Sequence, residues 1–392
     1  MLKKAAFLLI YLSVFIPVLK AQTKPLEVLP LKMIGVHTLI ELKINNSKPL
    51  KFVFDTGAGE SALSEEAAEK LGLKNEKITK AMEGAGASAE TWASEGNRIN
   101  IGKTTLDSVT FWVTDLSNLN LKGEKVDGII GYDLIKNFTA LIDIDKQQIK
   151  LYPATAFSKI SKGTPIDFTL VDNIPVFYAT VKTINSAPVS GQFFFDTGAG
   201  LGVVLHAPLV TKNALIDKLP VKTTLKFSGL GGAFKAYQTT LESVTFAGFT
   251  LKDLPGTLST ATSGTAADSI SAGTMGNDIL SRFNILISYP LQKISVVPNK
   301  RFNNAFNFNV SGLKLRKAKE GYIFIDYVME QSPAEKAGLK VNDVIVSMNG
   351  NNSMSLDEMV SLLSVSNRTI TIRVKNKENV EREVSLQTER FY

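Results

Sequence analysis

The feature that most constrains the fold is an internal repeat. The segment Phe54-Asp55-Thr56-Gly57-Ala58-Gly59 recurs 141 residues later as Phe195-Asp196-Thr197-Gly198-Ala199-Gly200. In both copies, alternating apolar and polar residues flank a short turn and lead into the aspartate, which is the period-two pattern of a β-hairpin. A unit of this size that occurs twice predicts two similar, mostly β lobes.

Three further features recur in the same order. Each copy has a Gly-rich segment typical of a hairpin tip, then a strand pair that contains the phrase Leu-Asp/Glu-Ser-Val-Thr-Phe, then a glycine that enters a short helix. Each copy closes on strands. The three features are Met82–Ala87, Leu106–Phe111 and Gly131 in the first copy, and Ser228–Ala233, Leu241–Phe246 and Gly276 in the second.

Composition limits the available chemistry. The chain has no cysteine, which excludes thiol nucleophiles, thiolate metal sites and disulfides. Its two histidines, His37 and His206, are far apart in sequence, so we expect no metal and no cofactor. The formal charge of +7 falls by three to +4 without Lys3, Lys4 and Lys20. Because no basic helix accompanies this small excess, we expect no nucleic-acid partner.

The N-terminal segment predicts a secretory signal peptide. Lys3 and Lys4 precede an uncharged run, Ala5 to Leu19, and Ala21 offers a small residue for cleavage. A membrane span needs about 20 residues, more than this run supplies. We therefore expect a periplasmic or secreted protein with no membrane span after cleavage. An uncleaved membrane anchor is the alternative.

The pattern changes after Pro298. Ser332 and Pro333 are typical of a helix start, and Gly338 of its end. Ser355 and Glu358 predict a capping box on a second helix, and strand patterns surround both. This favours an α+β module of about 90 residues, a size that can fold alone. The expected division is a signal peptide at 1–21, two lobes at 22–158 and 159–300, and this module at 301–392.

The two aspartates suggest a shared acidic site. Burial at the end of an apolar strand raises the pKa of a carboxyl, because the anion loses its hydration. Two carboxyls about 3 Å apart cannot both ionise, so the pair holds one proton. The charged member can take a proton from water while the neutral member protonates a carbonyl oxygen. The adjacent glycines let the backbone approach the carboxylates, and the threonine hydroxyls can hold the turns.

These residues resemble the aspartic peptidases, specifically their retropepsin-like lobe. Two lobes in one chain imply a pepsin-like arrangement with pseudo-twofold symmetry, in which each lobe supplies one aspartate. The resemblance implies the dyad Asp55 and Asp196, the supporting residues Thr56, Gly57, Thr197 and Gly198, and flap glycines at Gly84, Gly86, Gly229, Gly231 and Gly232. The chain departs from the pepsin-like pattern at Ala58 and Ala199, at Thr274, and in the absence of a tyrosine from the first flap.

The C-terminal module resembles a PDZ domain of the bacterial type. The resemblance rests on Gly321-Tyr322-Ile323, on Ser332 to Leu339, on Asp343-Val344-Ile345 and on Asn349-Gly350. In that family a loop before the first strand binds a peptide carboxylate through backbone N–H groups. The residues in the corresponding place are Gly312, Leu313 and Leu315.

The sequence therefore predicts a monomeric aspartic endopeptidase that hydrolyses peptide or protein substrates, with a PDZ module that docks a C-terminal peptide or regulates access. Two alternatives stay open. The first is a non-catalytic adaptor that holds peptides in the lobe cleft and the PDZ groove. The second is a dimer in which the lobes of different chains form the sites.

Overall fold

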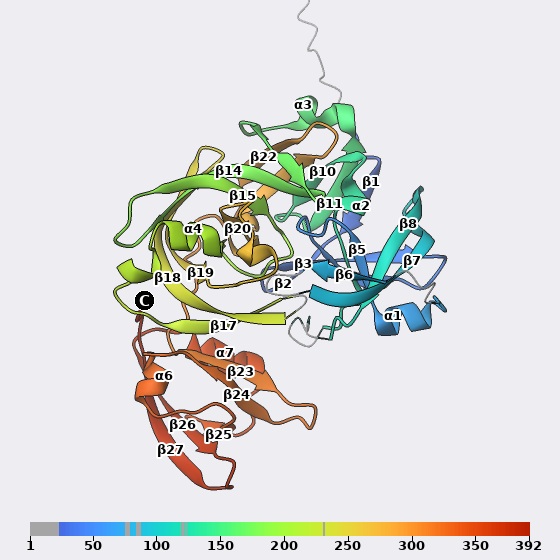
Figure 1. Ribbon diagram of the computed structural model, residues 1–392. Coiled ribbons are helices and arrows are strands. Elements are labelled where there is room, and N and C mark those ends of the chain that lie inside the picture. The colour runs from blue at the N-terminus through green and yellow to red at the C-terminus, as the bar shows by residue number, and fades with distance from the viewer. Residues whose placement is uncertain are drawn as a thin grey trace, which may run out of the picture.

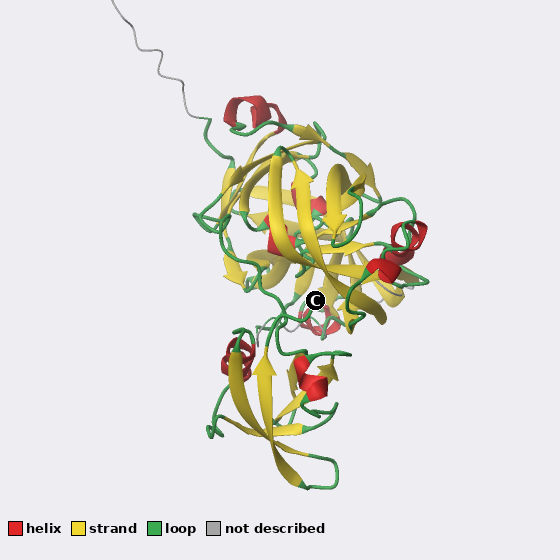
Figure 2. Ribbon diagram, turned by 90° about the vertical axis from the view of Figure 1, so that its left-hand side faces the viewer, coloured by secondary structure: helices red, strands yellow, loops and turns green. Residues whose placement is uncertain are grey.

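The structure is a computed structural model dominated by β-strands, with a few short helices (Figure 2). Within the described part of the chain, no helix is long and apolar enough to cross a membrane. The signal-peptide prediction, the first Gly-rich hairpin tip with Gly84 and Gly86, and Gly231 in the second tip lie outside the described residues. The structure describes residues 23–74, 79–83, 88–117, 119, 121, 124–229 and 232–392.

The first copy of the repeat forms an eight-stranded sheet in the order β2-β3-β4-β9-β5-β8-β7-β6, which an additional β3–β7 pairing closes on itself. Helix α1 (Glu65–Lys70) begins at Ser64, whose hydroxyl accepts from the N–H of Ala67. Helix α2 (Tyr132–Ile135) follows Gly131. The strands are β2 (Lys32–Ile34), β3 (His37–Ile44), β4 (Leu50–Phe54), β5 (Ser61–Ser64), β6 (Thr79–Glu83), β7 (Ser88–Ile101), β8 (Thr104–Thr114) and β9 (Gly128–Ile130).

The second copy forms a matching sheet in the order β13-β14-β15-β20-β16-β19-β18-β17, closed by β14–β18. Its helices are α4 (Ala207–Lys212) and α5 (Asn277–Leu280), and short 3₁₀ turns cover Ile216–Lys218 and Thr265–Ala267. The strands are β13 (Thr169–Val171), β14 (Ile174–Thr183), β15 (Val189–Phe195), β16 (Val203–Leu205), β17 (Thr224–Gly229), β18 (Gly232–Phe246), β19 (Phe249–Ser259) and β20 (Gly273–Met275).

Each copy has the predicted strand pair, but the shared phrase lies on different strands of the two pairs. Leu106–Phe111 lies in β8, whereas Leu241–Phe246 lies in β18, whose counterpart in the sheet order is β7. The true counterpart of β8 is β19, because each pairs in parallel with the strand after its Asp-Thr-Gly turn. The phrase alternates apolar and polar residues and so fits any half-buried strand, which is why its recurrence did not fix the alignment.

A third sheet joins the two copies. Its order is β1-β11-β10-β21-β22-β12, and β10 and β21 meet antiparallel at its centre, with Ala140 opposite Ile287. A pairing between corresponding strands is what a pseudo-twofold axis requires. The elements are β1 (Glu27–Pro30), β10 (Phe138–Asp143), β11 (Gln148–Pro153), β12 (Ile166–Asp167), β21 (Phe283–Ser288) and β22 (Lys293–Pro298), with a 3₁₀ turn (Ala154–Ala156) and α3 (Phe157–Ile160) between β11 and β12.

Apolar residues of both copies and of the shared sheet form one continuous core. It includes Phe54 and Phe195, the two residues directly before the aspartates, neither of which is exposed to solvent. Burial of these large side chains is the main favourable contribution to folding. Because the core is continuous, the two Asp-Thr-Gly turns are fixed relative to each other.

The C-terminal module has its own core and a five-stranded sheet in the order β23-β24-β25-β26-β27. The predicted helix starts are present: the Ser332 hydroxyl accepts from the N–H of Glu335, and Ser355 and Glu358 form a capping box. The predicted fold class, two mainly β lobes followed by an α+β module, is thus confirmed. The elements are β23 (Leu313–Lys317), β24 (Ile323–Val328), α6 (Pro333–Lys336), β25 (Val344–Met348), α7 (Leu356–Leu363), β26 (Arg368–Lys375) and β27 (Glu381–Thr388).

The C-terminal module contacts the second lobe, and β17 lies along this boundary (Figure 1). The hydroxyl groups of Thr224 in β17 and Tyr327 in β24 are 3.2 Å apart, and Lys235 in β18 forms an ion pair with Glu330 at 2.9 Å. The Arg390 guanidinium donates to both carboxylate oxygens of Asp253 in the second lobe. These contacts tie the module to the β17–β18 hairpin and to the lobe behind it.

Candidate active site

The two repeated aspartates lie at corresponding ends of buried strands. Asp55 follows β4 and Asp196 follows β15. Each of these strands pairs in parallel with the short strand before Gly131 or Gly276. The backbone N–H of Asp55 donates to Ile130 and that of Asp196 to Met275, so the turns begin at the same point of each sheet.

The two carboxyl groups meet between the lobes, where a hydrogen bond joins them. The N–H of Gly198 donates to Oδ1 of Asp196 at 2.9 Å and to Oδ1 of Asp55 at 3.2 Å, so one amide contacts both aspartates. A Cβ on Gly198 would lie 2.1 Å from Cγ of Asp55, and one on Gly57 would lie 2.5 Å from Cγ of Asp196. Glycine is required at both positions because any side chain would displace the opposite carboxyl.

Two threonine hydroxyls link the two Asp-Thr-Gly turns to each other. The Thr56 hydroxyl donates to the carbonyl of Phe195 at 2.6 Å and accepts from the N–H of Thr197 at 3.0 Å. The Thr197 hydroxyl accepts from the N–H of Thr56 at 3.0 Å and donates to the carbonyl of Phe54 at 3.3 Å. Both threonines are buried. The structure therefore brings Asp55, Asp196 and their four predicted supporting residues into one cluster.

Gly131 and Gly276, the glycines directly before the short helices α2 and α5, pack against the Asp-Thr-Gly turns. A Cβ on Gly131 would lie 1.7 Å from the carbonyl oxygen of Asp55, and one on Gly276 would lie 2.8 Å from that of Ala199. The residues that follow donate backbone N–H groups to the turns, Tyr132 to Ala58 and Asn277 to Ala199. The helix-entry glycine that follows each aspartate in the sequence is therefore the residue on which the Asp-Thr-Gly turn of that lobe packs.

The surroundings raise the pKa of both carboxyls, but unequally. Loss of hydration raises the pKa of Asp55 well above its usual range, and the charge and hydrogen bond of Asp196 raise it further. Loss of hydration also raises the pKa of Asp196, but the hydrogen bond from Asp55, the amides of Ala199 and Gly198 and the charge of His37 lower it. Because ionisation of one carboxyl disfavours ionisation of the other, the pair shares a single proton.

The sequence assigned no role to His37 beyond excluding a multi-histidine metal site. In the structure His37 begins β3 and lies beside the second lobe's turn, where a Cβ on Gly200 would be 2.4 Å from its Nε2. His206 lies elsewhere, buried between the hydroxyl groups of Ser271 and Thr274. The sequence feature that could have pointed to His37 is its position at the start of the β3–β4 hairpin, which leads to Asp55.

Of the predicted flap glycines, Gly229 and Gly232 face each other across the end of the β17–β18 hairpin. In the C-terminal module the amides of the predicted carboxylate loop already have acceptors. The N–H of Gly312 donates to Oδ1 of Asn309 at 2.8 Å, and that of Leu313 donates to the Ser311 hydroxyl at 3.2 Å. Leu315 packs against the core of the module.

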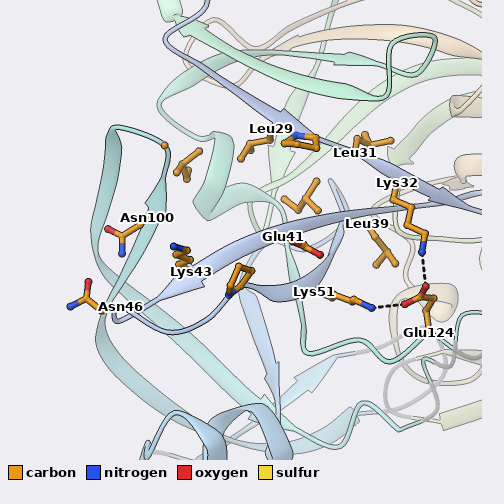
Figure 3. Close-up of a pocket in the computed structure, with 15 residues that line it drawn as sticks. Leu29, Leu31, Lys32, Leu39, Glu41, Lys43, Asn46, Lys51, Asn100 and Glu124 are labelled. Atoms are coloured by element: carbon orange, nitrogen blue, oxygen red, sulfur yellow. Dashed lines mark hydrogen bonds and ion pairs between the residues drawn. The ribbon is translucent and has the colours of Figure 1, made fainter.

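A cavity of about 920 Å³ lies away from the aspartates, on the first lobe beside β3 (Figure 3). Leu29, Leu31 and Leu39 line one part of it, and Glu124 bridges Lys32 and Lys51 across another, at 2.5 and 2.6 Å. Neither aspartate lines this cavity, so we do not assign the candidate chemistry to it.

Within the described ranges, no three His, Asp or Glu side chains form a group that could hold a metal ion.

Two protein-family models match parts of the chain. Residues 40–134 match the family model for aspartyl proteases, and residues 324–376 match a PDZ domain model. No curated protein matches the chain. In solved structures, 358 chains match, among them one from a retropepsin-like aspartic protease from Rickettsia conorii. That match has 26% identity and a TM-score of 0.24, and covers 32% of this chain and 87% of the other.

The protease family model spans Asp55 and Gly131, the aspartate and helix-entry glycine of the first copy. The PDZ model spans β24 to β26 of the C-terminal sheet. Both resemblances predicted from the sequence are thereby confirmed. Residues 40–134 are thus similar to an aspartyl protease domain, and residues 324–376 to a PDZ domain.

Proposed function

We propose that the chain is an aspartic endopeptidase whose catalytic pair is Asp55 and Asp196, and that it acts in the periplasm or after secretion. One observation carries this proposal: the backbone N–H of Gly198 donates to Oδ1 of Asp196 at 2.9 Å and to Oδ1 of Asp55 at 3.2 Å, so two carboxyls from separate lobes of one chain meet at one site. The proposed units are a signal peptide at 1–21, lobes at 22–158 and 159–300, and the PDZ domain from 301. We propose a monomer, because a single chain supplies both aspartates.

In the proposed reaction, ionised Asp196 removes a proton from a water molecule held between the carboxyls. The water oxygen attacks the carbonyl carbon of the peptide bond, while Asp55 donates its proton to the carbonyl oxygen. When the tetrahedral intermediate collapses, the amide nitrogen receives a proton, the C–N bond breaks, and the pair again holds one proton. Thr56, Thr197, Gly57 and Gly198 keep the two carboxyls in place throughout.

The proposed PDZ role is to dock a C-terminal peptide or to regulate access to the cleft. Two features support it. The first is β23, an edge strand next to α7, which leaves a sheet edge for an added peptide strand. The second is the pair of contacts from Tyr327 and Glu330 to the β17–β18 hairpin, whose tip is the predicted second flap. Peptide carboxylate binding at Gly312 and Leu313 would replace the present side-chain acceptors.

The hairpin contact gives a testable charge-swap prediction. Glu330→Lys places two cations against each other, loosens the hairpin, and should raise KM for a peptide about two- to fivefold, as expected for an exposed ion pair. The double variant Lys235→Glu/Glu330→Lys should restore the parent KM. Glu320→Lys, the same charge change in the exposed turn after β23, is the control. Equal KM values for Glu330→Lys and Glu320→Lys would remove the regulatory proposal.

The endopeptidase proposal is tested by cleavage of a peptide library at acidic and neutral pH, with and without a statine inhibitor that mimics the tetrahedral intermediate. We expect internal peptide bonds to be cut and the statine to stop the cutting. Binding of library peptides without any cleavage would instead support the non-catalytic adaptor.

A further inference from the structure

His37 is held at the second lobe's Asp-Thr-Gly turn by a hairpin of the first lobe. It directly follows the two-residue turn between β2 and β3, Gly35-Val36. Asn277 in α5 donates its amide to the carbonyl of Val36, and the Arg301 guanidinium donates to that of Gly35 at 3.4 Å. The residue before His37 is thus fixed by the lobe that carries Asp196, not by its own lobe alone.

The imidazole ring packs on the backbone of that turn. A Cβ on Gly200 would be 2.4 Å from Nε2 and 2.6 Å from Cε1, so only glycine leaves room for the ring. The ring lies next to Gly200, two residues after Gly198, the residue whose N–H contacts both aspartates. The other ring nitrogen, Nδ1, is buried and has no hydrogen-bond partner. A buried nitrogen that can accept a proton therefore lies within the electrostatic reach of Asp196.

This arrangement has no counterpart in the other lobe. Ile34 pairs with His37 across the β2–β3 turn, and Val171 pairs with Ile174 across the β13–β14 turn. Ile174 therefore occupies the position of His37, and it cannot take up a proton. The imidazole thus makes the surroundings of the two aspartates chemically different.

We propose that His37 is a positioning residue whose imidazolium, formed in acid, holds Asp196 in its ionised form and so keeps the aspartate pair singly protonated. The role rests on the proposed peptidase function. The imidazolium stabilises the Asp196 anion through their mutual attraction. The pair consequently stays in its active form at a lower pH than two isolated carboxyls would allow.

The charges around the ring are consistent with this attraction. Burial lowers the pKa of His37, while the backbone of Gly198 and the charge of Asp196 raise it. Other ionisable groups of the packed elements include Asp55, Tyr289, Arg301 at the β2–β3 turn and Asp278 in α5, and the strands β2, β3 and β4 also carry Lys32, Glu41, Lys43 and Lys51. Arg301 contacts the backbone of Gly35 rather than the ring, so Asp196 is the charge that acts on the imidazole.

The placement is tested without any activity measurement. The chain has only two histidines, so a pH titration of the ¹⁵N-labelled imidazoles in the full chain resolves His37 from His206. We expect Asp196→Asn to lower the pKa of His37 by about one pH unit, because the stabilising anion is gone, and to leave His206 unchanged. Equal His37 titrations in the two proteins would overturn the proposal.

The role in the reaction is tested by the pH profile of kcat/KM. His37→Gln should move the acidic limb upward by about one pH unit and leave the alkaline limb, which reports loss of the proton on Asp55, in place. The control His206→Gln should move neither limb, and thermal unfolding of both variants establishes that they fold. An acidic limb that is unchanged in His37→Gln would overturn the proposal. A chain that cuts no peptide fails the proposed function, while the imidazole titration still decides the placement.

Discussion

We expect Asp55→Asn and Asp196→Asn each to lower kcat/KM for peptide cleavage by about 10²–10⁴-fold. Either change removes a group that must exchange a proton during hydrolysis, and the amide that replaces it keeps nearly the same shape. The measurement is cleavage of one peptide, found in the library, at a series of pH values.

Asp107→Asn is the matched control for these variants. Asp107 is an exposed first-lobe aspartate that pairs only with Arg98 among the contacts described, and its loss should leave cleavage unchanged. If either Asp55→Asn or Asp196→Asn cut the peptide as fast as the parent chain, the proposed pair would be wrong.

Thr56→Val should cause a large loss of stability, lowering the free energy of unfolding of the first lobe by about 2–5 kcal/mol. Valine keeps the shape of threonine but leaves the carbonyl of Phe195 and the N–H of Thr197 buried without their partner. Each unsatisfied buried group costs about 1–3 kcal/mol. The two Asp-Thr-Gly turns would then lose a link that joins them.

Denaturant unfolding followed by tryptophan fluorescence measures this effect, since both tryptophans, Trp92 and Trp112, lie in the first lobe. Thr56→Ser is the control: it keeps the hydroxyl and removes one methyl group, which should cost only about 1 kcal/mol. Equal stabilities for Thr56→Val and Thr56→Ser would show that the hydroxyl does not link the turns.

The internal repeat and the helix-capping residues made much of the fold predictable from the sequence. The aspartates could be placed because each ends a run of apolar residues, and the helix starts at Ser332 and Ser355 depend on neighbouring residues alone. The shared phrase does not align the copies strand by strand, because it lies after the β7–β8 turn at Gly102 in the first copy and before the β18–β19 turn at Gly248 in the second.

The missed features all depend on contacts between distant segments. His37 lies against the second lobe, where Asn277 donates to the carbonyl of Val36, 241 residues earlier in the chain. The shared sheet likewise brings β10 to β21. Local patterns predict which residues form strands, but they do not predict which strand of one copy meets which strand of the other. The contact of His37 with the second lobe could therefore not be read from two identical motifs.

The central claim is that one folded chain contributes both carboxyls to one site. Mixing Asp55→Asn with Asp196→Asn chains tests it most directly, with cleavage of the peptide as the readout and gel-filtration mass as a companion measurement. We predict that the mixture, refolded together, stays as inactive as either variant alone, because every chain carries one defective half of its own site. Restored cleavage would contradict the account, since it would mean that lobes of different chains form the site.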